Sequence, residues 1–528
     1  MKKMGYSRNP GLRFYLLLMI LFVGFSFHGV CQMQNTEPIL HYTVSMPDPA
    51  NHLFHVELDC SGWAKDTIDF KMPRWMPGYY QIMEYSEEVV NFLAERKSGK
   101  TVPVAKTDKN SWRIIVDKNA PFSISYDVKA DKKFVANSYL DSTHGYIVPA
   151  ATFMFINEYI NTPLSLEISI NHKWNKIVTG LDQVRGKINK YIVPDFDVLY
   201  DCPVLIGNLE ELPSFKINGI PHRFIAYNPG SFNREAFISN LEKTVKAAVE
   251  IIGDIPYNQY TFIGIGPGFG GIEHLNNTTV SFNGNGLDNP EAMSRMIKFL
   301  AHEYFHHYNV KRIRPYELGP FDYNMENRTN LLWVSEGLTV YYEYLIVRRA
   351  GVISEEQLFA SMESNINAFE NDPGRFFQSL SQSSYNTWND GPFGNKTTGA
   401  DQTISYYDKG PVAGMILDFA IRYATQNKKS LDDVMRHLYY HYYKNLKRGF
   451  TDAEFQQVCE DVAGTSLSRE FEYVYTTKEI DYSKYLTYAG LKISVEIDKN
   501  NSKRKFIISK LDNKNTAQEA ILQSWSGR

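Results

Sequence analysis

The first third of the chain alternates hydrophobic and polar residues over short runs. Hydrophobic positions recur at every second residue in segments 53–58, 112–116, 122–128 and 164–170. This period places successive side chains on opposite faces, which is typical of half-buried β-strands. Turn-forming residues separate the runs, and no long helical pattern interrupts them. We therefore predict a β-sandwich-like domain over residues 32–210.

From about residue 211 the hydrophobic period becomes mixed. A helical pattern over 237–252 precedes a strand pattern over 260–265, and segment 276–282 is predicted as loop and strand. Helical periodicity then dominates, in segments 355–369, 412–424, 431–443 and 452–462. The order of these patterns predicts a multidomain α+β fold, with domains at 211–345 and 346–488.

Two further stretches lack a helical period. Residues 381–402 are rich in Gly, Ser and Asn and predict a long loop. Loops of this length are commonly functional, so we expect it to be ordered against the functional site. The chain from residue 490 predicts strands followed by a polar segment rich in Lys, Asn and Gln.

The N-terminus has the pattern of an export signal. Four basic residues lie within the first 13 positions, and an apolar run follows over 14–27. The run is short for a membrane span, so we expect residues 1–31 to be a signal peptide and the protein to be periplasmic or secreted. Cys31 suggests a lipid anchor as an alternative, but the bulky Val30 before it argues against this. An uncleaved single anchor is the other alternative, and no other stable membrane association is expected.

Composition narrows the class of protein. The chain is 43% hydrophobic and 22% charged, which is typical of a globular protein, and its length after the signal suits about three domains. The net charge of -3 argues against nucleic acid as a main partner. The chain has four cysteines, which are Cys31, Cys60, Cys202 and Cys459. Their spacing matches no metal-binding module and no disulfide framework. A Cys60–Cys202 bridge and buried free thiols are both compatible with this spacing.

The segment 301–307 reads Ala-His-Glu-Tyr-Phe-His-His and contains His-Glu-x-x-His, the signature of zinc metallopeptidases. Apolar residues before it recur at helical spacing, so His302 and His306 are predicted one turn apart on one helix face. Two imidazoles placed in this way can bind one Zn²⁺. Glu303 lies about 100° around the helix, beside the metal's open position. The alternative is a solvated surface helix that carries the motif by chance, and the apolar setting argues against it.

A catalytic zinc site takes three protein ligands and leaves the fourth position to water. Glu336, in Trp-Val-Ser-Glu-Gly (333–337), is the best candidate for the third ligand. It lies far enough after His306 for a second helix to return to the first. Apolar residues follow it at helical spacing, so we expect Glu336 near the start of that helix. The predicted cofactor is one Zn²⁺ per chain.

A glycine-rich segment, Gly-Pro-Gly-Phe-Gly-Gly-Ile-Glu-His (266–274), lies before the zinc motif. Its glycines formally match a dinucleotide-binding loop, but no helical pattern opens there, as such a loop requires. Gly270 and Gly271 are better suited to close approach of the backbone to a ligand. Glu273 is predicted to meet a cationic group of that ligand, and a surface carboxylate on a hairpin is the alternative.

Six segments form a set in chain order: Pro-Arg-Trp-Met-Pro-Gly-Tyr (73–79), Gly-Gly-Ile-Glu-His (270–274), His-Glu-Tyr-Phe-His (302–306), Asn-Val-Lys-Arg-Ile-Arg-Pro (309–315), Leu-Trp-Val-Ser-Glu-Gly-Leu-Thr (332–339) and Tyr-Asp-Lys-Gly (407–410). Together they resemble the glycyl aminopeptidase family of gluzincin metallopeptidases, distant relatives of aminopeptidase N. The resemblance covers about residues 35–490, and the combined motifs are highly specific. Taken alone, segment 73–79 is typical of a rigid loop, because its two prolines fix φ.

The resemblance implies an N-terminal β domain, a thermolysin-like catalytic domain and a helical domain. A PDZ domain usually follows in this family. Segment 488–493 resembles the start of such a domain and 517–520 its middle. We therefore expect residues 489–528 to be a truncated PDZ-like segment.

The resemblance also implies roles for individual residues. Tyr407 resembles the tyrosine that donates a hydrogen bond to the oxyanion in related aminopeptidases, and a packed aromatic residue is the alternative. Val340 stands where thermolysin-like sites often have Asp, which makes Glu343 a candidate partner for a ligand histidine. Arg312 and Arg314 are compatible with binding a substrate carboxylate, but we favour structural ion pairs.

The predicted function is zinc-dependent removal of the first residue of peptides. The resemblance implies a preference for small N-terminal residues such as Gly or Ala. Glu303 would take a proton from the attacking water and pass it to the leaving amine. One alternative is an endopeptidase on the same fold, which would not need Glu273 as an amine anchor. A catalytically inactive peptide-binding scaffold is the other, and it would not need Glu303.

Overall fold

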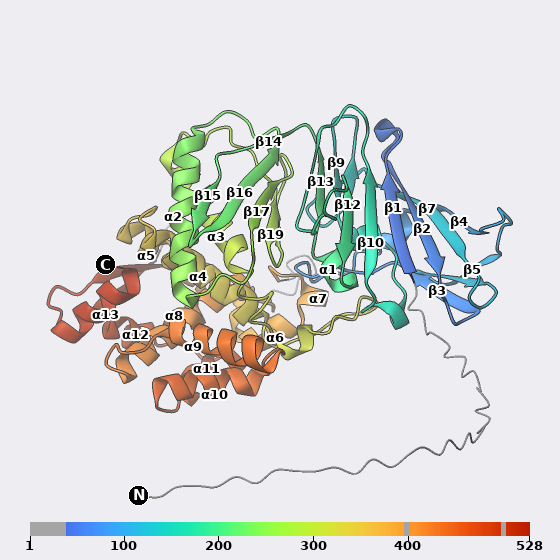
Figure 1. Ribbon diagram of the computed structural model, residues 1–528. Helices are drawn as coiled ribbons and strands as arrows, with labels where there is room; N and C mark the ends of the chain where they lie inside the picture. The colour runs from blue at the N-terminus through green and yellow to red at the C-terminus, as the bar shows by residue number, and fades with distance from the viewer. Residues whose placement is uncertain (1–38, 395–401, 498–502, 528) are drawn as a thin grey trace, which may run out of the picture. The chain divides into compact units, whose positions relative to one another are not determined.

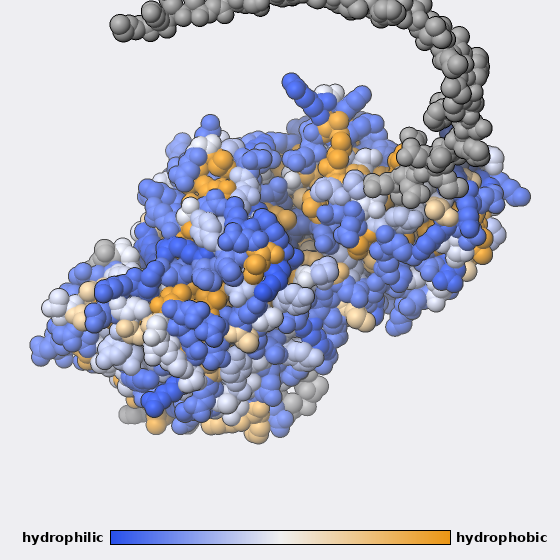
Figure 2. Space-filling view, turned by 60° about the horizontal axis from the view of Figure 1, so that its bottom comes forward, coloured by the Kyte–Doolittle hydropathy of each residue, from blue (hydrophilic) through white to orange (hydrophobic). Residues whose placement is uncertain are grey.

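The computed structural model of the protein describes residues 39–394, 402–497 and 503–527. The predicted signal peptide and Cys31 lie outside these residues. Within the described ranges, no helix is both long and apolar enough to cross a membrane. On the face shown in Figure 2, hydrophilic residues dominate and hydrophobic residues form small patches between them.

The N-terminal third is a β-rich domain (Figure 1). Its six-stranded sheet has the order β12 (Lys190–Val193), β10 (Leu164–Ser169), β1 (Ile39–Ser45), β2 (Leu53–Ser61), β7 (Phe122–Lys129), β4 (Val89–Arg96). Two smaller sheets have the orders β3 (Thr67–Lys71), β6 (Ser111–Ile115), β5 (Val104–Asp108) and β11 (Lys176–Thr179), β13 (Val204–Gly207), β9 (His144–Ile147), β8 (Tyr139–Leu140). The four strands predicted from alternation are confirmed as β2, β6, β7 and β10.

Alternating side chains build the core of this domain. In β2, Phe54, Val56 and Leu58 are buried, while the residues between them are more exposed. Phe92 of β4 stacks on Trp112 of β6 with ring centroids 5.6 Å apart, which joins the six-stranded sheet to the three-stranded one. The short helix α1 (Phe196–Tyr200) follows β12 and buries Phe196 and Tyr200 in the same core.

The next sheet positions the candidate site. Its strand order is β14 (Leu209–Glu211), β16 (Ile220–Tyr227), β17 (Tyr260–Gly264), β19 (Asn277–Val280), β18 (Gly271–Glu273), and β15 (Phe215–Ile217) also pairs with β16. Strands β16, β17 and β19 are parallel. Strand β18 is antiparallel to β19 and ends the strand order, which leaves one side of its backbone free to pair with a ligand.

This sheet is covered on both faces. Phe224 and Phe262 pack into the core that includes α2 (Arg234–Ile252) and α3 (Pro290–Phe305). Their neighbours Ile225 and Ile263 belong to the core of the N-terminal domain. Because successive residues of a strand point to opposite faces, the sheet lies between the helices and the N-terminal strands (Figure 1).

The rest of the chain is mainly helical. The helices are α4 (Leu338–Arg349), α5 (Glu355–Glu370), α6 (Leu380–Tyr385), α7 (Thr387–Asp390), α8 (Tyr406–Ala424), α9 (Leu431–His437), α10 (Asp452–Ala463), α11 (Ser468–Tyr475) and α12 (Tyr482–Tyr488). A π-helical stretch, Leu438–Leu446, continues α9. All four helical segments predicted after residue 346 are confirmed, although the second begins earlier than its apolar period indicated.

The prediction of a continuous loop over 381–402 is wrong for its first part, which contains α6 and α7. Ser379 begins α6 with a reciprocal capping box to Gln382, and the helix buries Ser383 and Ser384. The small polar residues indicated a loop in the sequence, but in the structure they cap the start of α6 and pack in its buried face. Residues 395–401 lie outside the described residues.

The tail forms a hairpin and a helix. Strands β20 (Leu491–Ile497) and β21 (Arg504–Lys510) pair antiparallel, and α13 (Thr516–Ser526) follows. Trp525 is fully buried, and its Nε1 donates a 2.8 Å hydrogen bond to the hydroxyl of Tyr341 in α4. The tail therefore shares one core with the helices before it. Its PDZ-like character and the predicted domain boundaries stay predictions.

The structure decides between a Cys60–Cys202 disulfide and free thiols. Cys60, Cys202 and Cys459 are buried free thiols, so the possible Cys60–Cys202 bridge is wrong. Each lies in apolar surroundings, and burial raises the pKa of all three thiols. They are therefore packing residues rather than reactive groups.

Candidate active site

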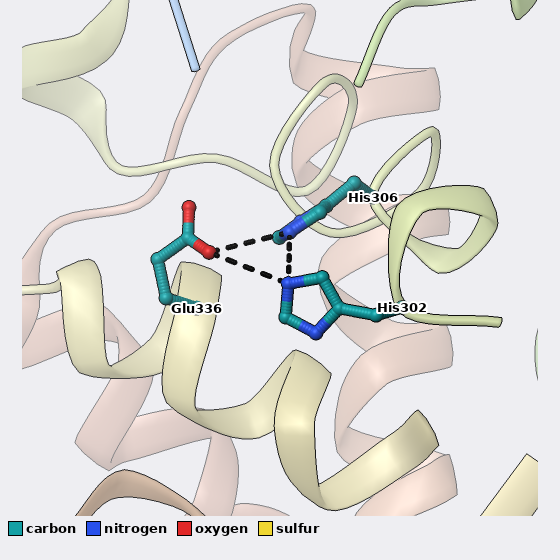
Figure 3. A group of neighbouring side chains, drawn as sticks. All are labelled: His302, His306 and Glu336. Carbon is teal, nitrogen blue, oxygen red and sulfur yellow. Dashed lines mark hydrogen bonds and ion pairs between the residues drawn. The ribbon is translucent and has the colours of Figure 1, made fainter. Parts of the chain in front are cut away.

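Three side chains converge at the end of α3. His302 and His306 place their Nε2 atoms 2.9 Å apart, and Oε2 of Glu336 lies 3.7 Å and 3.3 Å from these two nitrogens (Figure 3). In the described part of the chain this is the one group of three such side chains able to hold a metal ion. Two imidazoles and a carboxylate form the ligand set of many catalytic zinc sites.

Local sequence explains how these residues are presented. The side chain of Asn289 caps α3 by accepting from the N–H groups of Glu291 and Ala292, and Pro290 occupies the first turn. Apolar residues of α3 face the core, which turns the two histidines toward Glu336. Glu336 lies in a π-helical turn, Trp333–Gly337, directly before α4, so its predicted place at a helix start is confirmed.

Each histidine is oriented by a partner at its other nitrogen. Nδ1 of His302 lies 2.8 Å from Oε2 of Glu343, and Nδ1 of His306 lies 2.7 Å from the backbone oxygen of Asn309. Both Nε2 atoms therefore remain available to a common metal ion, and the site fits zinc. The predicted contact of Glu343 is confirmed. The partner of His306 was missed, because a backbone oxygen carries no residue-type signal.

Two buried carboxylates of the site differ in their pKa. Burial would raise the pKa of Glu336, but the neighbouring His306 and His302 lower it well below its usual range, which keeps this side chain ionised. Burial raises the pKa of Glu303 to about 7, although both histidines oppose the shift. A carboxylate with a pKa in this range is suited to accept and return a proton near neutral pH.

Gly271 makes room for Glu303. A Cβ atom at Gly271 would lie 2.6 Å from Cδ of Glu303, so any other residue would displace this carboxylate. Gly270 has φ of +91°, a conformation that favours glycine. The two glycines were predicted to admit a ligand. In the structure, the side chain of Glu303 occupies the space beside Gly271. Both glycines also line the cavity, where a ligand can approach them.

Glu273 is buried on β18, so the alternative of a surface carboxylate is wrong. Its Oε2 would lie 2.9 Å from a Cβ at Gly78, a residue of the N-terminal domain. Its Oε1 is buried and has no hydrogen-bond partner among the described residues. Glu273 also adds to the raised pKa values of Glu303 and Tyr407, whose largest cause is burial, so its charge faces the same site.

Tyr407 is the second residue of α8 (Tyr406–Ala424) and faces the metal ligands. Its hydroxyl donates a 2.9 Å hydrogen bond to Oε2 of Glu336. A Cβ atom at Gly337 would lie 2.6 Å from Cα of Gly410, so two glycines allow α8 to approach the turn that holds Glu336. Asn365 donates to the backbone oxygen of Tyr407 at 3.2 Å and fixes the start of the helix. The tyrosine is thus part of the site and more than a packed aromatic residue.

A cavity of about 350 Å³ opens above these groups. His302 and Glu303 are among its polar lining residues, and many of the others are aromatic or apolar: Phe134, Val135, Phe269, Phe299, Val340 and Phe393. The loop after β3 contributes Gly78, Tyr79 and Tyr80, and the segment around α7 contributes Thr387 and Phe393. The described part of segment 381–402 is therefore ordered against the site, as predicted.

Some residues of the predicted motifs have other roles. Arg312 is buried and donates to the backbone oxygens of Leu275 and His307, at 2.9 Å and 2.7 Å. It therefore stabilises the fold through carbonyl groups, and within the described residues it forms no ion pair of the kind that we favoured. Segment 73–79 is anchored by Trp75, whose Nε1 donates to the backbone oxygen of Asp322 at 2.8 Å. This hydrogen bond fixes the segment so that Gly78 and Tyr80 line the site. The two prolines of the segment did not indicate this role.

Comparison with known proteins identifies the family to which the chain is similar. The Peptidase M61 N-terminal domain matches residues 41–208, and the M61 glycyl aminopeptidase domain matches residues 295–413. No curated protein sequence matches the chain. An aminopeptidase N family protein from Idiomarina loihiensis is structurally similar, with a TM-score of 0.82 at 24% identity over 88% of this chain and 81% of that one.

Two structures from Deinococcus radiodurans are more distant. An M1 zinc metallopeptidase has a TM-score of 0.51 at 12% identity, over 84% of this chain and 94% of that one. A mutant of that enzyme bound to a Tyr-Ser-Ala substrate has the same TM-score, 0.51, at 11% identity and the same coverage, 84% and 94%. At these identities the similarity shows a shared fold.

Proposed function

Since the chain belongs to the M61 glycyl aminopeptidase family and is a metallopeptidase, we propose that it is a zinc-dependent aminopeptidase that removes small N-terminal residues such as Gly or Ala from peptides. Its partners are then peptide substrates. Export to the periplasm or beyond is part of the proposal, as are the thermolysin-like character of the catalytic domain and the PDZ-like character of the tail.

The buried carboxylate of Glu273 carries the aminopeptidase assignment. A buried carboxylate oxygen without a partner is costly, so its presence points to a cationic ligand. A peptide N-terminus is an amine with pKa near 7.7–8.0, and much of it is charged at neutral pH. Glu273 follows Ile272 and Gly271 on the edge strand, and Gly271 contacts Glu303. The amine would thus lie about one residue from the bond that Glu303 serves.

Tyr80 supports the preference for small residues. Its side chain is 7% exposed and packs edge-on against Trp388 with ring centroids 6.2 Å apart. Burial, then the charges of Glu336 and Glu273, raise the pKa of its hydroxyl, so this group lies near both carboxylates. A first residue held between Glu273 and the metal ligands would have its side chain against this ring, which would favour a small side chain.

The chain's own groups can then be assigned to steps of hydrolysis. Zinc, when bound by His302, His306 and Glu336, would supply a Lewis acid that activates water and polarises the scissile carbonyl. Glu303 would accept the proton of the attacking water and return it to the leaving amine. Tyr407 would donate its hydroxyl proton in a hydrogen bond to the carbonyl oxygen as negative charge develops there.

A peptide digest tests the proposal and its alternatives. Purified protein would be incubated with free and N-acetylated Gly- and Ala-initiated peptides, with and without a chelator, and products read by mass spectrometry. We expect loss of the first residue, inhibition by the chelator, and little cleavage of acetylated peptides. Internal cleavage of both forms at equal rates would support the endopeptidase instead, and no cleavage of any peptide would support the scaffold.

Three variants separate binding from chemistry. Glu303→Gln should keep zinc and lose most turnover, because it removes a base and not a ligand. His302→Ala should lose zinc, and full metal content in this variant would contradict the ligand assignment. Glu273→Ala should lose most activity on free peptides, mainly through KM, with little further loss on acetylated ones.

A further inference from the structure

The candidate site gives the substrate a direction, provided that the proposed function holds. Glu273, at one end of β18, would bind the substrate's amine, and Gly271 contacts Glu303 beside the bond to be cleaved. Continuing in the same direction, Gly270 and Phe269 line the cavity. The residues after the cleaved bond would therefore lie along Gly270 and Phe269, opposite the part of α3 that precedes His302.

That part of α3 carries two cations. Lys298 and Arg295 precede His302 by about one and two turns, and both line the same cavity as His302 and Glu303. At 1.5 Å per residue they lie about 6 Å and about 10 Å along the helix from His302. An extended peptide advances about 3.5 Å per residue, so these distances correspond to the second to fourth residues of a substrate.

Neither Lys298 nor Arg295 forms a close ion pair with a carboxylate among the described residues. Nζ of Lys298 lies 4.9 Å from the ring centroid of Tyr344, and across the described residues it has no ion pair. Arg295 lies 3.8 Å from Glu291, and both side chains are largely exposed, at 68% and 79%. Such an exposed pair is weak and exchanges readily for another carboxylate. Glu343, which also lines the cavity, is held by His302.

We propose that Arg295 and Lys298 bind a carboxylate of the substrate on the leaving-group side of the cleaved bond. The carboxylate can come from the C-terminus of a di-, tri- or tetrapeptide, or from an acidic side chain at the second to fourth position. This site deepens the proposed aminopeptidase function: it makes the enzyme one for short peptides or for peptides with an acidic residue near the N-terminus. A carboxylate bound between two cations gains charge-assisted hydrogen bonds that an amide cannot replace.

Matched peptides test the inference. Gly-Ala-Ala would be compared as free acid and as C-terminal amide, and Gly-Ala-Glu-Ala-amide with Gly-Ala-Gln-Ala-amide. In the parent we expect kcat/KM to be about tenfold higher for each carboxylate-bearing member, mainly through KM, and the preference to shrink at high salt. A response confined to one pair identifies the source of the carboxylate, C-terminus or side chain.

Variants tie the preference to the two cations. In the double variant Arg295→Gln/Lys298→Gln the ratio of kcat/KM between acid and amide should fall to about one, while Lys246→Gln, on an exposed position of α2, should keep the parent's ratio. Arg295→Lys on the Lys298→Gln background should restore part of it. Equal kcat/KM for acid and amide in the parent, or an unchanged ratio in the double variant, would overturn the inference. Failure of the proposed function is distinct: the parent would then cleave neither form.

Discussion

The hydroxyl of Tyr407 donates its hydrogen bond to Oε2 of Glu336, the same oxygen that lies nearest to Nε2 of both His302 and His306. This contact joins the first turn of α8 to the metal ligands on α3 and before α4. A bound metal ion would compete for that oxygen, which would free the tyrosine hydroxyl to meet a substrate. The hydroxyl of Tyr407 can therefore either hold Glu336 in place or donate to the substrate, and a variant separates these two roles.

Tyr407→Phe should lower kcat by about 10²–10³ with little change in KM, because an oxyanion donor acts mainly on the transition state. Zinc content should stay at the parent's level. Tyr423→Phe, an exposed tyrosine of the same helix, is the matched control. If the variant instead lost zinc but kept the parent's kcat when saturated with metal, the hydroxyl would serve to hold Glu336.

Glu343→Ala should weaken zinc binding by about 10–100-fold, because it removes the acceptor that orients His302. Competition with a fluorescent chelator would measure the affinity. Glu343→Gln keeps an oxygen acceptor and should lose less. Equal affinity in the parent and the alanine variant would show that the ring of His302 is oriented by packing alone.

Tyr80→Ala should widen the range of first residues. Removing the ring leaves space beside Glu273 and the metal ligands, so the ratio of kcat/KM for Leu- against Gly-initiated peptides should rise by about tenfold or more. Tyr80→Phe retains the ring and should keep the parent's ratio. Were both variants to retain the preference for Gly, another wall of the cavity would set specificity.

Asp201 predicts a pH-dependent contribution to stability. It accepts from the N–H of Leu275 at 2.7 Å and lies 2.5 Å from Nζ of Lys311, which fixes the chain just after Glu273. Burial would raise the pKa of Asp201, but Lys311 and His274 lower it from 3.8 to about 2. Because the folded pKa is the lower one, the contribution is present above about pH 4 and is lost as pH falls toward 2.

Urea unfolding from pH 7 to pH 3 would measure this contribution. Asp201→Asn should be less stable than the parent by about 2–3 kcal/mol at neutral pH, and the difference should shrink below pH 4. Asp59→Asn, on an exposed position of β2, is the control. A difference that stays constant down to pH 3 would contradict the role of ionised Asp201.

The sequence by itself determined the parts of this protein that depend on local periods. Alternation marked β2, β6, β7 and β10 because neighbouring side chains of a strand always face opposite sides. The metal ligands on α3 could be predicted because four residues make about one helical turn, which puts His302 and His306 side by side in any context. Glu336 was predicted from the Trp-Val-Ser-Glu-Gly motif before a helical pattern, and Glu343 from the family resemblance and its position on that helix.

Only the tertiary structure decided how distant segments complete the site. Gly78 and Tyr80 reach Glu273 from another domain, and no period of the sequence encodes a contact across about 200 positions. The partner of His306 is a backbone oxygen of Asn309, which any residue type could supply. Helices α6 and α7 form where small polar residues find caps and buried partners, and Arg312 found carbonyl groups in place of the expected carboxylates. These outcomes depend on which surfaces meet after folding, and that is set by packing between segments far apart in the chain.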